Sequence, residues 1–134
     1  MGQQQLLLII LGVIVVGIAV VVGITMFQDN AISANRDAVT NDLVSLGARA
    51  QQYYRRPTPV GGGGVSFVGL RMGKLVGPVT GSQWVNPNGT FEVIGTPTQT
   101  GVDFKGVGYE KSNGTFVEVH CRVSPDSLQT TVIN

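Results

Sequence analysis

Few residues in this sequence have the type and spacing that an active site requires. The chain has one cysteine, Cys121, and one histidine, His120, and the two are adjacent. Neighbouring residues on a β-strand point to opposite faces, so we do not expect the two side chains to share a metal ion. A structural zinc site would need further Cys or His ligands, which the sequence does not offer. The single cysteine also excludes an intrachain disulfide.

Other chemical motifs are equally weak. Gly61–Gly64 lacks the Lys-Ser/Thr and the strand-before, helix-after setting of a phosphate-binding loop. We find no paired carboxylates and no nucleophile–base arrangement, so we expect no enzyme, no cofactor and no bound metal. Asn88 and Asn113 each begin an Asn-Gly-Thr glycosylation pattern, although Asn-Gly is also a strong turn signal. We expect both asparagines to lie at surface tips, where a glycan could be attached.

Composition and charge narrow the class of protein. A length of 134 residues predicts one folded domain in addition to the N-terminal segment. Charged residues make up 13% of the chain, against roughly 25% in typical soluble domains. From position 57 onward there are five basic and five acidic residues. With equal numbers of basic and acidic residues, this part of the chain has no excess positive charge for binding DNA or RNA, so we expect no nucleic-acid partner.

A long uncharged segment dominates the N-terminal part of the chain. Leu6–Phe27 is a run of 22 residues without a charged side chain. As a helix it would be roughly 33 Å long, enough to cross a hydrocarbon core of about 30 Å. It exceeds the roughly 7–15 residues of a signal-peptide core and no basic region precedes it, so we expect a retained membrane span. Its large apolar residues are Leu6, Leu7, Leu8, Ile9, Ile10, Leu11, Val13, Ile14, Val15, Val16, Ile18, Val20, Val21, Val22, Ile24 and Phe27.

The helix is predicted to continue as an amphipathic helix. From Asp29 to Arg56 the chain contains no proline and one glycine, Gly47. Charged residues such as Arg36 and Asp42 are expected opposite an apolar stripe, and the prolines of Pro57–Pro59 end the helix. The stripe consists of Ile32, Val39, Leu43, Leu46, Ala50 and Tyr53.

These segments predict an α+β fold. A helix of about 50 residues, far above the usual mean of about 11–12, is followed by a small antiparallel sheet. We expect residues 1–28 to form a transmembrane or self-associating half and residues 29–56 an amphipathic half that needs a partner surface. Residues 57–64 are expected to form a flexible linker rich in proline and glycine, and residues 65–134 a globular β domain.

The β domain is predicted from strand-like runs separated by turn signals. Thr115–Val123 alternates, and its apolar face should pack on the helix stripe or on a neighbouring subunit. Asn113-Gly114 predicts a hairpin before it. The predicted strands are Val65–Met72, Thr90–Ile94, Val102–Glu110, Thr115–Val123 and Leu128–Ile133, and the apolar face of the fourth consists of Val117, Val119, Cys121 and Val123.

This architecture resembles the type IV pilin family. The resemblance covers the whole arrangement of helix and β domain, and its sequence-specific part lies in the first 27 residues. It implies that the apolar half anchors the subunit as a single span in the cytoplasmic membrane. The same half would then pack in the core of a helical filament of identical subunits, a pilus or fimbrium on the cell surface. The sequence identifies no adhesion target.

The N-terminus departs from the family pattern. Pilin precursors usually carry a short basic leader that ends in glycine, and a glutamate five residues into the mature chain. Here Met1-Gly2 precedes Gln3. The fifth residue is Gln5 counted from Met1, or Leu7 counted from Gln3, so the acidic residue is missing on either count. The resemblance therefore does not extend to that carboxylate.

Three functions agree with these features. The first is a filament subunit, and the second is a pseudopilin of a type II secretion-like machine that forms only short assemblies. The third is a monomeric, membrane-anchored surface module whose β domain binds a ligand. For the filament, Asp in place of Val15 or Val20 should abolish assembly, while the fragment Thr58–Asn134 is expected to fold by itself.

Overall fold

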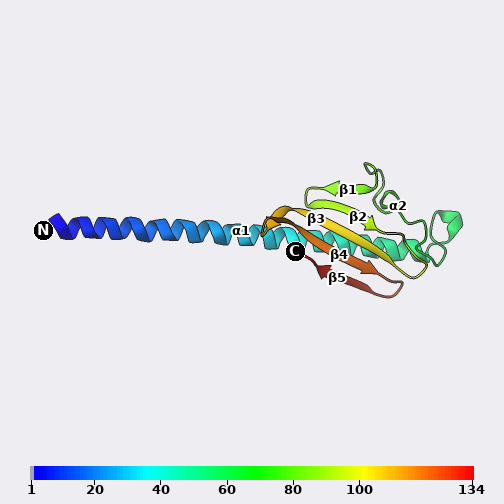
Figure 1. The fold of residues 1–134 in the computed structure, drawn as a ribbon. Helices are drawn as coiled ribbons and strands as arrows, with labels where there is room; N and C mark the ends of the chain where they lie inside the picture. The colour runs from blue at the N-terminus through cyan, green and yellow to red at the C-terminus, as the bar shows by residue number, and fades with distance from the viewer. Residues whose placement is uncertain (1) are drawn as a thin grey trace.

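One long helix organises the fold. The computed structural model describes residues 2–134, and its first element is α1 (Gly2–Arg55), a helix of 54 residues. Figure 1 shows α1 as a rod whose N-terminal half projects away from a sheet that lies along its C-terminal half. The predicted α+β class, with a long N-terminal helix followed by an antiparallel sheet, is confirmed.

Five strands form one antiparallel sheet in sequence order. Each strand pairs with the one before it, so the sheet is a meander with its first and last strands at the edges. Asn113 and Gly114 have φ angles of 52° and 81° and connect the third and fourth strands, which confirms the predicted Asn-Gly hairpin. The strands are β1 (Gln83–Asn86), β2 (Gly89–Ile94), β3 (Val102–Ser112), β4 (Thr115–Val123) and β5 (Leu128–Val132).

One predicted strand is wrong and one strand was missed. Val65–Met72 is not a strand, because this region forms loops that lead into the short helix α2 (Met72–Val76). Gly69 has a φ of 81°, which interrupts an extended strand, and Phe67 is fully buried in the core. The missed strand, β1, has only four residues, too few for an alternating pattern to stand out.

The apolar stripe of α1 is covered by the sheet of the same chain. Val39, Leu43, Leu46 and Ala50 are at most 1% exposed, Tyr53 is also buried, and Ile32 packs at the edge of the core. They form one cluster with the inward face of β4 and with Phe91 and Phe104 from β2 and β3. The stripe, apart from the half-buried Ile32, and the inward face of β4, which consists of Val117, Val119, Cys121 and Val123, are therefore buried as expected.

This shared core corrects one expectation about the domain. The fragment Thr58–Asn134 would lose one complete side of the core, because four fully covered side chains come from α1. Burial of apolar surface is the main force that holds a domain together. The packing therefore speaks against the expectation that this fragment folds by itself, and we now predict that it needs the stripe of α1.

Glycines let the helix and the sheet approach closely. A Cβ atom at Gly106 would lie 2.7 Å from Val39 Cγ1, and one at Gly108 would overlap Asn35 Oδ1. On the helix side, a Cβ atom at Gly47 would overlap the side chain of Leu128. Interiors are packed as densely as organic crystals, so none of these positions has room for a larger residue.

The segment after α1 is a tight cap rather than a flexible linker. Its first turn is the 3-10 helix η1 (Thr58–Val60). The Gly63 N–H donates to the Tyr53 carbonyl at 2.8 Å, and the Val65 N–H donates to the Tyr54 carbonyl at 2.8 Å. A side chain at Gly63 would collide with backbone atoms. The glycines therefore allow a close, hydrogen-bonded reversal over the helix end, where 57–64 had been expected to form a flexible linker.

Candidate functional site: the uncovered apolar half of α1

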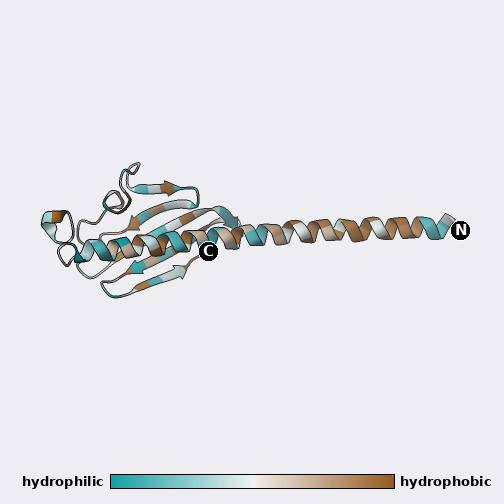
Figure 2. Cartoon of the chain, turned by 180° about the vertical axis from the view of Figure 1, so that it is seen from behind, coloured by the Kyte–Doolittle hydropathy of each residue, from teal (hydrophilic) through white to brown (hydrophobic). Residues whose placement is uncertain are grey.

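The N-terminal half of α1 has no cover within the chain. All residues from Gly2 to Asn30 are exposed, and none of the most apolar 18-residue stretch is buried. Seventeen large apolar side chains between Leu6 and Phe27 are 49–76% exposed, and they include all sixteen that the sequence suggested for a span or filament core. Figure 2 shows this half as a largely hydrophobic rod, whereas the half beside the sheet alternates between hydrophobic and hydrophilic residues.

Such a surface is unfavourable in water. Covering one large apolar side chain is worth about 1.5–3 kcal/mol, so seventeen of them amount to tens of kcal/mol. Soluble monomers rarely expose contiguous apolar patches larger than a few hundred Å². The helix pairs its own backbone groups, which is the condition for entering hydrocarbon. This half would therefore be more stable in an apolar environment, such as lipid or the apolar surfaces of other chains.

The apolar half has no single binding face. At 3.6 residues per turn, Gly12 and Gly23 lie within about 20° of one another around the axis, whereas Gly17 lies about 140° away from Gly12. Apart from neighbouring parts of the helix itself, no described residue lies within 4 Å of a Cβ built at these glycines. The hydroxyl of Thr25 donates to the Val21 carbonyl at 3.0 Å, so it is satisfied within the helix. A helix that is apolar on all sides fits an environment that surrounds it.

Comparison with known proteins adds no family to this description. No family model, curated protein or solved structure matches this chain.

The two predicted glycosylation sites differ in accessibility. Asn113 is exposed in the β3–β4 turn, as expected. Asn88 is half-buried, and its Nδ2, the atom to which a glycan would be attached, donates to Asp42 Oδ2 at 2.9 Å. The same oxygen accepts a hydrogen bond from Asn86 Nδ2 at 3.0 Å. The expectation that Asn88 is a free surface tip was wrong, and Asp42 contacts the β1–β2 turn instead of lying opposite the stripe.

His120 and Cys121 lie on opposite faces of β4. His120 Nε2 lies 2.6 Å from Glu118 Oε1 on the outer face, whereas Cys121 is 1% exposed on the inner face. Burial, with a smaller effect of the Asp103 carboxylate, raises the pKa of the Cys121 thiol to about 11. Residues 2–134 contain no group of three or more His, Cys, Asp or Glu side chains that could hold a metal. In this position the thiol acts as an apolar core residue.

The outer face of the sheet is polar. Lys105 Nζ lies 2.5 Å from Glu92 Oε1, and Arg122 Nε lies 4.0 Å from Asp103 Oδ1. A hydrogen bond from Gln83, together with Lys105, holds the pKa of the Glu92 carboxyl below its ordinary value. An antiparallel sheet with one face on the core and one polar face can stand in water on the polar side.

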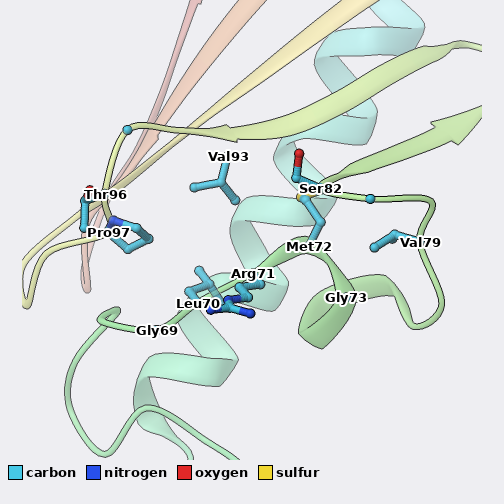
Figure 3. Close-up of a pocket in the computed structure, with 12 residues that line it drawn as sticks. Gly69, Leu70, Arg71, Met72, Gly73, Val79, Ser82, Val93, Thr96 and Pro97 are labelled. Carbon is cyan, nitrogen blue, oxygen red and sulfur yellow. The ribbon is translucent and has the colours of Figure 1, made fainter.

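An open pocket lies between α2 and the loop after β2. Its volume is about 560 Å³. Figure 3 shows Val93 above the pocket, Leu70 and Arg71 below it, and Thr96 and Pro97 at one side. The lining residues include one cation and no carboxylate, cysteine or histidine. They therefore provide no acid–base or nucleophilic pair for catalysis.

Proposed function

We propose that this chain is a structural subunit of a type IV pilus-like extracellular filament, which polymerises through the apolar half of α1. The main observation in its support is the difference in burial between the two halves of one uninterrupted helix. The stripe of the second half is buried by the chain's own sheet, whereas the first half is apolar on all sides and uncovered. The domain thus needs no partner for its core, and only the first half of α1 needs other molecules.

The proposed assembly has two stages. Leu6–Phe27 first spans the bilayer, where lipid covers its apolar side chains. Moving it from lipid into a bundle of identical helices brings little additional hydrophobic gain, because lipid tails are as apolar as leucine. Packing between helices and contacts between β domains must therefore favour the filament. The polar outer face of the sheet would then form the filament surface.

The same contrast supports a second candidate, a membrane-anchored monomer. Because α1 and the sheet complete one core within the chain, the sheet needs no neighbouring subunit to cover its inner face. The mass of the detergent-solubilised protein separates the two functions. A filament subunit gives large assemblies, whereas an anchored module gives a monomer or a small oligomer. A pseudopilin would give short assemblies of low abundance.

Charge substitutions in the apolar half test the filament directly. Val15→Asp and Val20→Asp each place a carboxylate in the middle part of the apolar segment Leu6–Phe27, and a carboxylate at the centre of a membrane helix costs about 2.5–3.5 kcal/mol for insertion. Electron microscopy of sheared surface material should show filaments for the wild type and none for either variant. Mass spectrometry of the same material identifies the N-terminal peptide of the subunit. The matched control is Val68→Asp, at a side chain that is 55% exposed on the β domain, which should leave filaments intact.

The outcome can contradict the proposal in two ways. Filaments of normal yield from Val15→Asp would show that this half is not buried in their core. A wild-type chain that forms no filaments and has a monomeric mass in detergent would favour the membrane-anchored module.

A further inference from the structure

The most exposed aromatic side chains belong to the end of the apolar half of α1 and to the β3–β4 hairpin. Phe27, Tyr109 and Phe116 are 76%, 51% and 47% exposed, respectively. The other six aromatic side chains of residues 2–134 are buried or half-buried. Phe27 closes the apolar half of α1, while Tyr109 and Phe116 belong to the β3–β4 hairpin. The exposure of aromatic rings is thus confined to two neighbouring elements.

The hairpin lies where α1 leaves the domain. Tyr109 lines a hollow together with Gln28 and Ile32 of the helix. Phe116 pairs across the hairpin with Lys111, whose Nζ lies 4.8 Å from the centre of the Phe116 ring. Figure 1 shows the β3–β4 turn at the end of the sheet nearest the projecting half of α1. We call Phe27, Tyr109, Lys111 and Phe116 the aromatic collar.

The collar is at the height of the lipid headgroups when the apolar half spans a bilayer. Ile32 follows Phe27 by five residues, which corresponds to about 7.5 Å along a helix. The headgroup layer on each side of the hydrocarbon core is about 5–8 Å thick. A hairpin that lines the same hollow as Gln28 and Ile32 therefore reaches this layer.

The side chains of the collar are of the kinds that bind at this height. Aromatic residues are enriched at membrane–water interfaces, and lysine can lay its apolar stem on a surface while its ammonium group stays in water. Charged residues of both signs occur close to the collar along the chain, with Asp29 and Arg36 on α1 and Glu110 and Lys111 on β3. Attraction to anionic lipid is therefore not the expected source of binding.

We propose that the aromatic collar docks on the lipid headgroup layer and seats the β domain on the membrane before assembly. This inference rests on the proposed membrane-inserted state and adds a second contact to it. A subunit that enters the filament must then withdraw the collar from lipid as well as the helix. The collar thereby favours the membrane-bound subunit over the filament.

The test measures how close the hairpin lies to the headgroups in the full chain. A Cys121→Ala background receives one cysteine, either by Thr115→Cys in the hairpin or by Asp126→Cys in the β4–β5 turn, and each is labelled with a fluorophore. The chain is placed in phosphatidylcholine vesicles that carry a nitroxide on their headgroups. Quenching should be at least about twofold stronger at position 115 than at position 126, because aromatic side chains hold the hairpin at the interface.

Variants of the collar separate docking from mere proximity to the helix. Phe116→Ser should reduce the excess quenching at position 115 by about half or more, whereas Phe116→Trp should preserve it. Val85→Ser is the matched control, because it removes another exposed apolar side chain and should change nothing. Added anionic lipid should also have little effect.

Three results would overturn the inference. Quenching that is unchanged in Phe116→Ser shows that the collar does not dock on lipid. If the same variant also loses its filaments, the collar is a contact between subunits instead. If alkaline carbonate extracts the wild-type chain from vesicles, both the membrane-inserted state and the docking of the collar are overturned. If the chain is retained but Phe116→Ser leaves the quenching unchanged, only the docking of the collar is overturned.

Discussion

The chemistry of Cys121 is set by its position on β4. Its side chain faces the helix in a fully covered site, and this burial raises its pKa to about 11. The thiolate is the reactive form of cysteine, so at neutral pH the side chain is an inert apolar group.

The raised pKa of Cys121 predicts a pH dependence of stability. The ordinary pKa is 9.0, so the neutral thiol is favoured by folding. Its contribution is fully present below pH 9 and is lost as the pH rises through about 11. Urea unfolding of the fragment Asp29–Asn134 should be measured at pH 9 and at pH 11. Between these two pH values, the free energy of unfolding should fall further for this fragment than for the same fragment with Cys121→Ala. Equal losses in the two proteins would contradict this prediction.

Asp42 is predicted to stabilise the β1–β2 turn. Its Oδ2 accepts hydrogen bonds from the side chains of Asn86 and Asn88. Asp42→Ala removes a charged acceptor from two half-buried amides, so urea unfolding should show a loss of about 1–3 kcal/mol. Asp37→Ala is the matched control, because Asp37 is exposed on the same helix and should change stability by less than about 0.5 kcal/mol. If both variants lost a similar amount of stability, the cause would be the removal of a negative charge from α1 and not the loss of the hydrogen bonds to the turn.

Among the elements, the contact between α1 and β3 depends on missing side chains. Gly106 lies directly against Val39 and Phe91. Gly106→Ala should therefore lower the free energy of unfolding by about 1–3 kcal/mol through overpacking. Gly73→Ala in α2 is the control, because a Cβ there meets its nearest atom at 3.7 Å.

A double-mutant cycle identifies the cause of that loss. Val39→Ala opens space opposite Gly106, so the double variant should lose less stability than the sum of the two single losses. An additive result would mean that the alanine at position 106 acts on the strand and not on its contact with the helix.

Periodicity predicted the elements that have one buried face. The stripe of α1 and the alternation of Val117 and Val119 each repeat often enough to reveal that face. Val65–Met72 has the same apolar content, yet Phe67 is drawn into the core and Gly69 turns the chain. The local pattern does not show which neighbour will cover a side chain.

The missed features of the site are contacts between distant segments. Asn88 and Asp42 are 46 residues apart, and their hydrogen bond depends on how the β1–β2 turn meets α1. The approach of Gly106 to Val39 depends on the same packing. The uncovered apolar half, in contrast, was predictable because its continuous lack of charge is a local property. The collar required the hairpin and the helix to be placed together.

For the whole molecule, the division of α1 predicts which part of the chain folds alone. The fragment Asp29–Asn134 retains every residue of the core, so it should be folded and monomeric by circular dichroism and sedimentation. Thr58–Asn134 should be unfolded, because it lacks the side chains that α1 contributes to the core. Fibres of native diameter from Asp29–Asn134 would show that the apolar half is dispensable for assembly.

The shared core also has a consequence for biosynthesis. Val39 leaves the ribosome 67 residues before Gly106, the glycine against which it packs. The stripe of α1 must therefore wait until β3 and β4 have been translated, and pairing over such separations is slow. The apolar half emerges first and can enter the bilayer while the rest of the nascent chain is still unfolded. If the apolar half enters a membrane, as proposed above, translation order favours its insertion before the domain closes, and the exposed helix need not cross the aqueous phase attached to a finished domain.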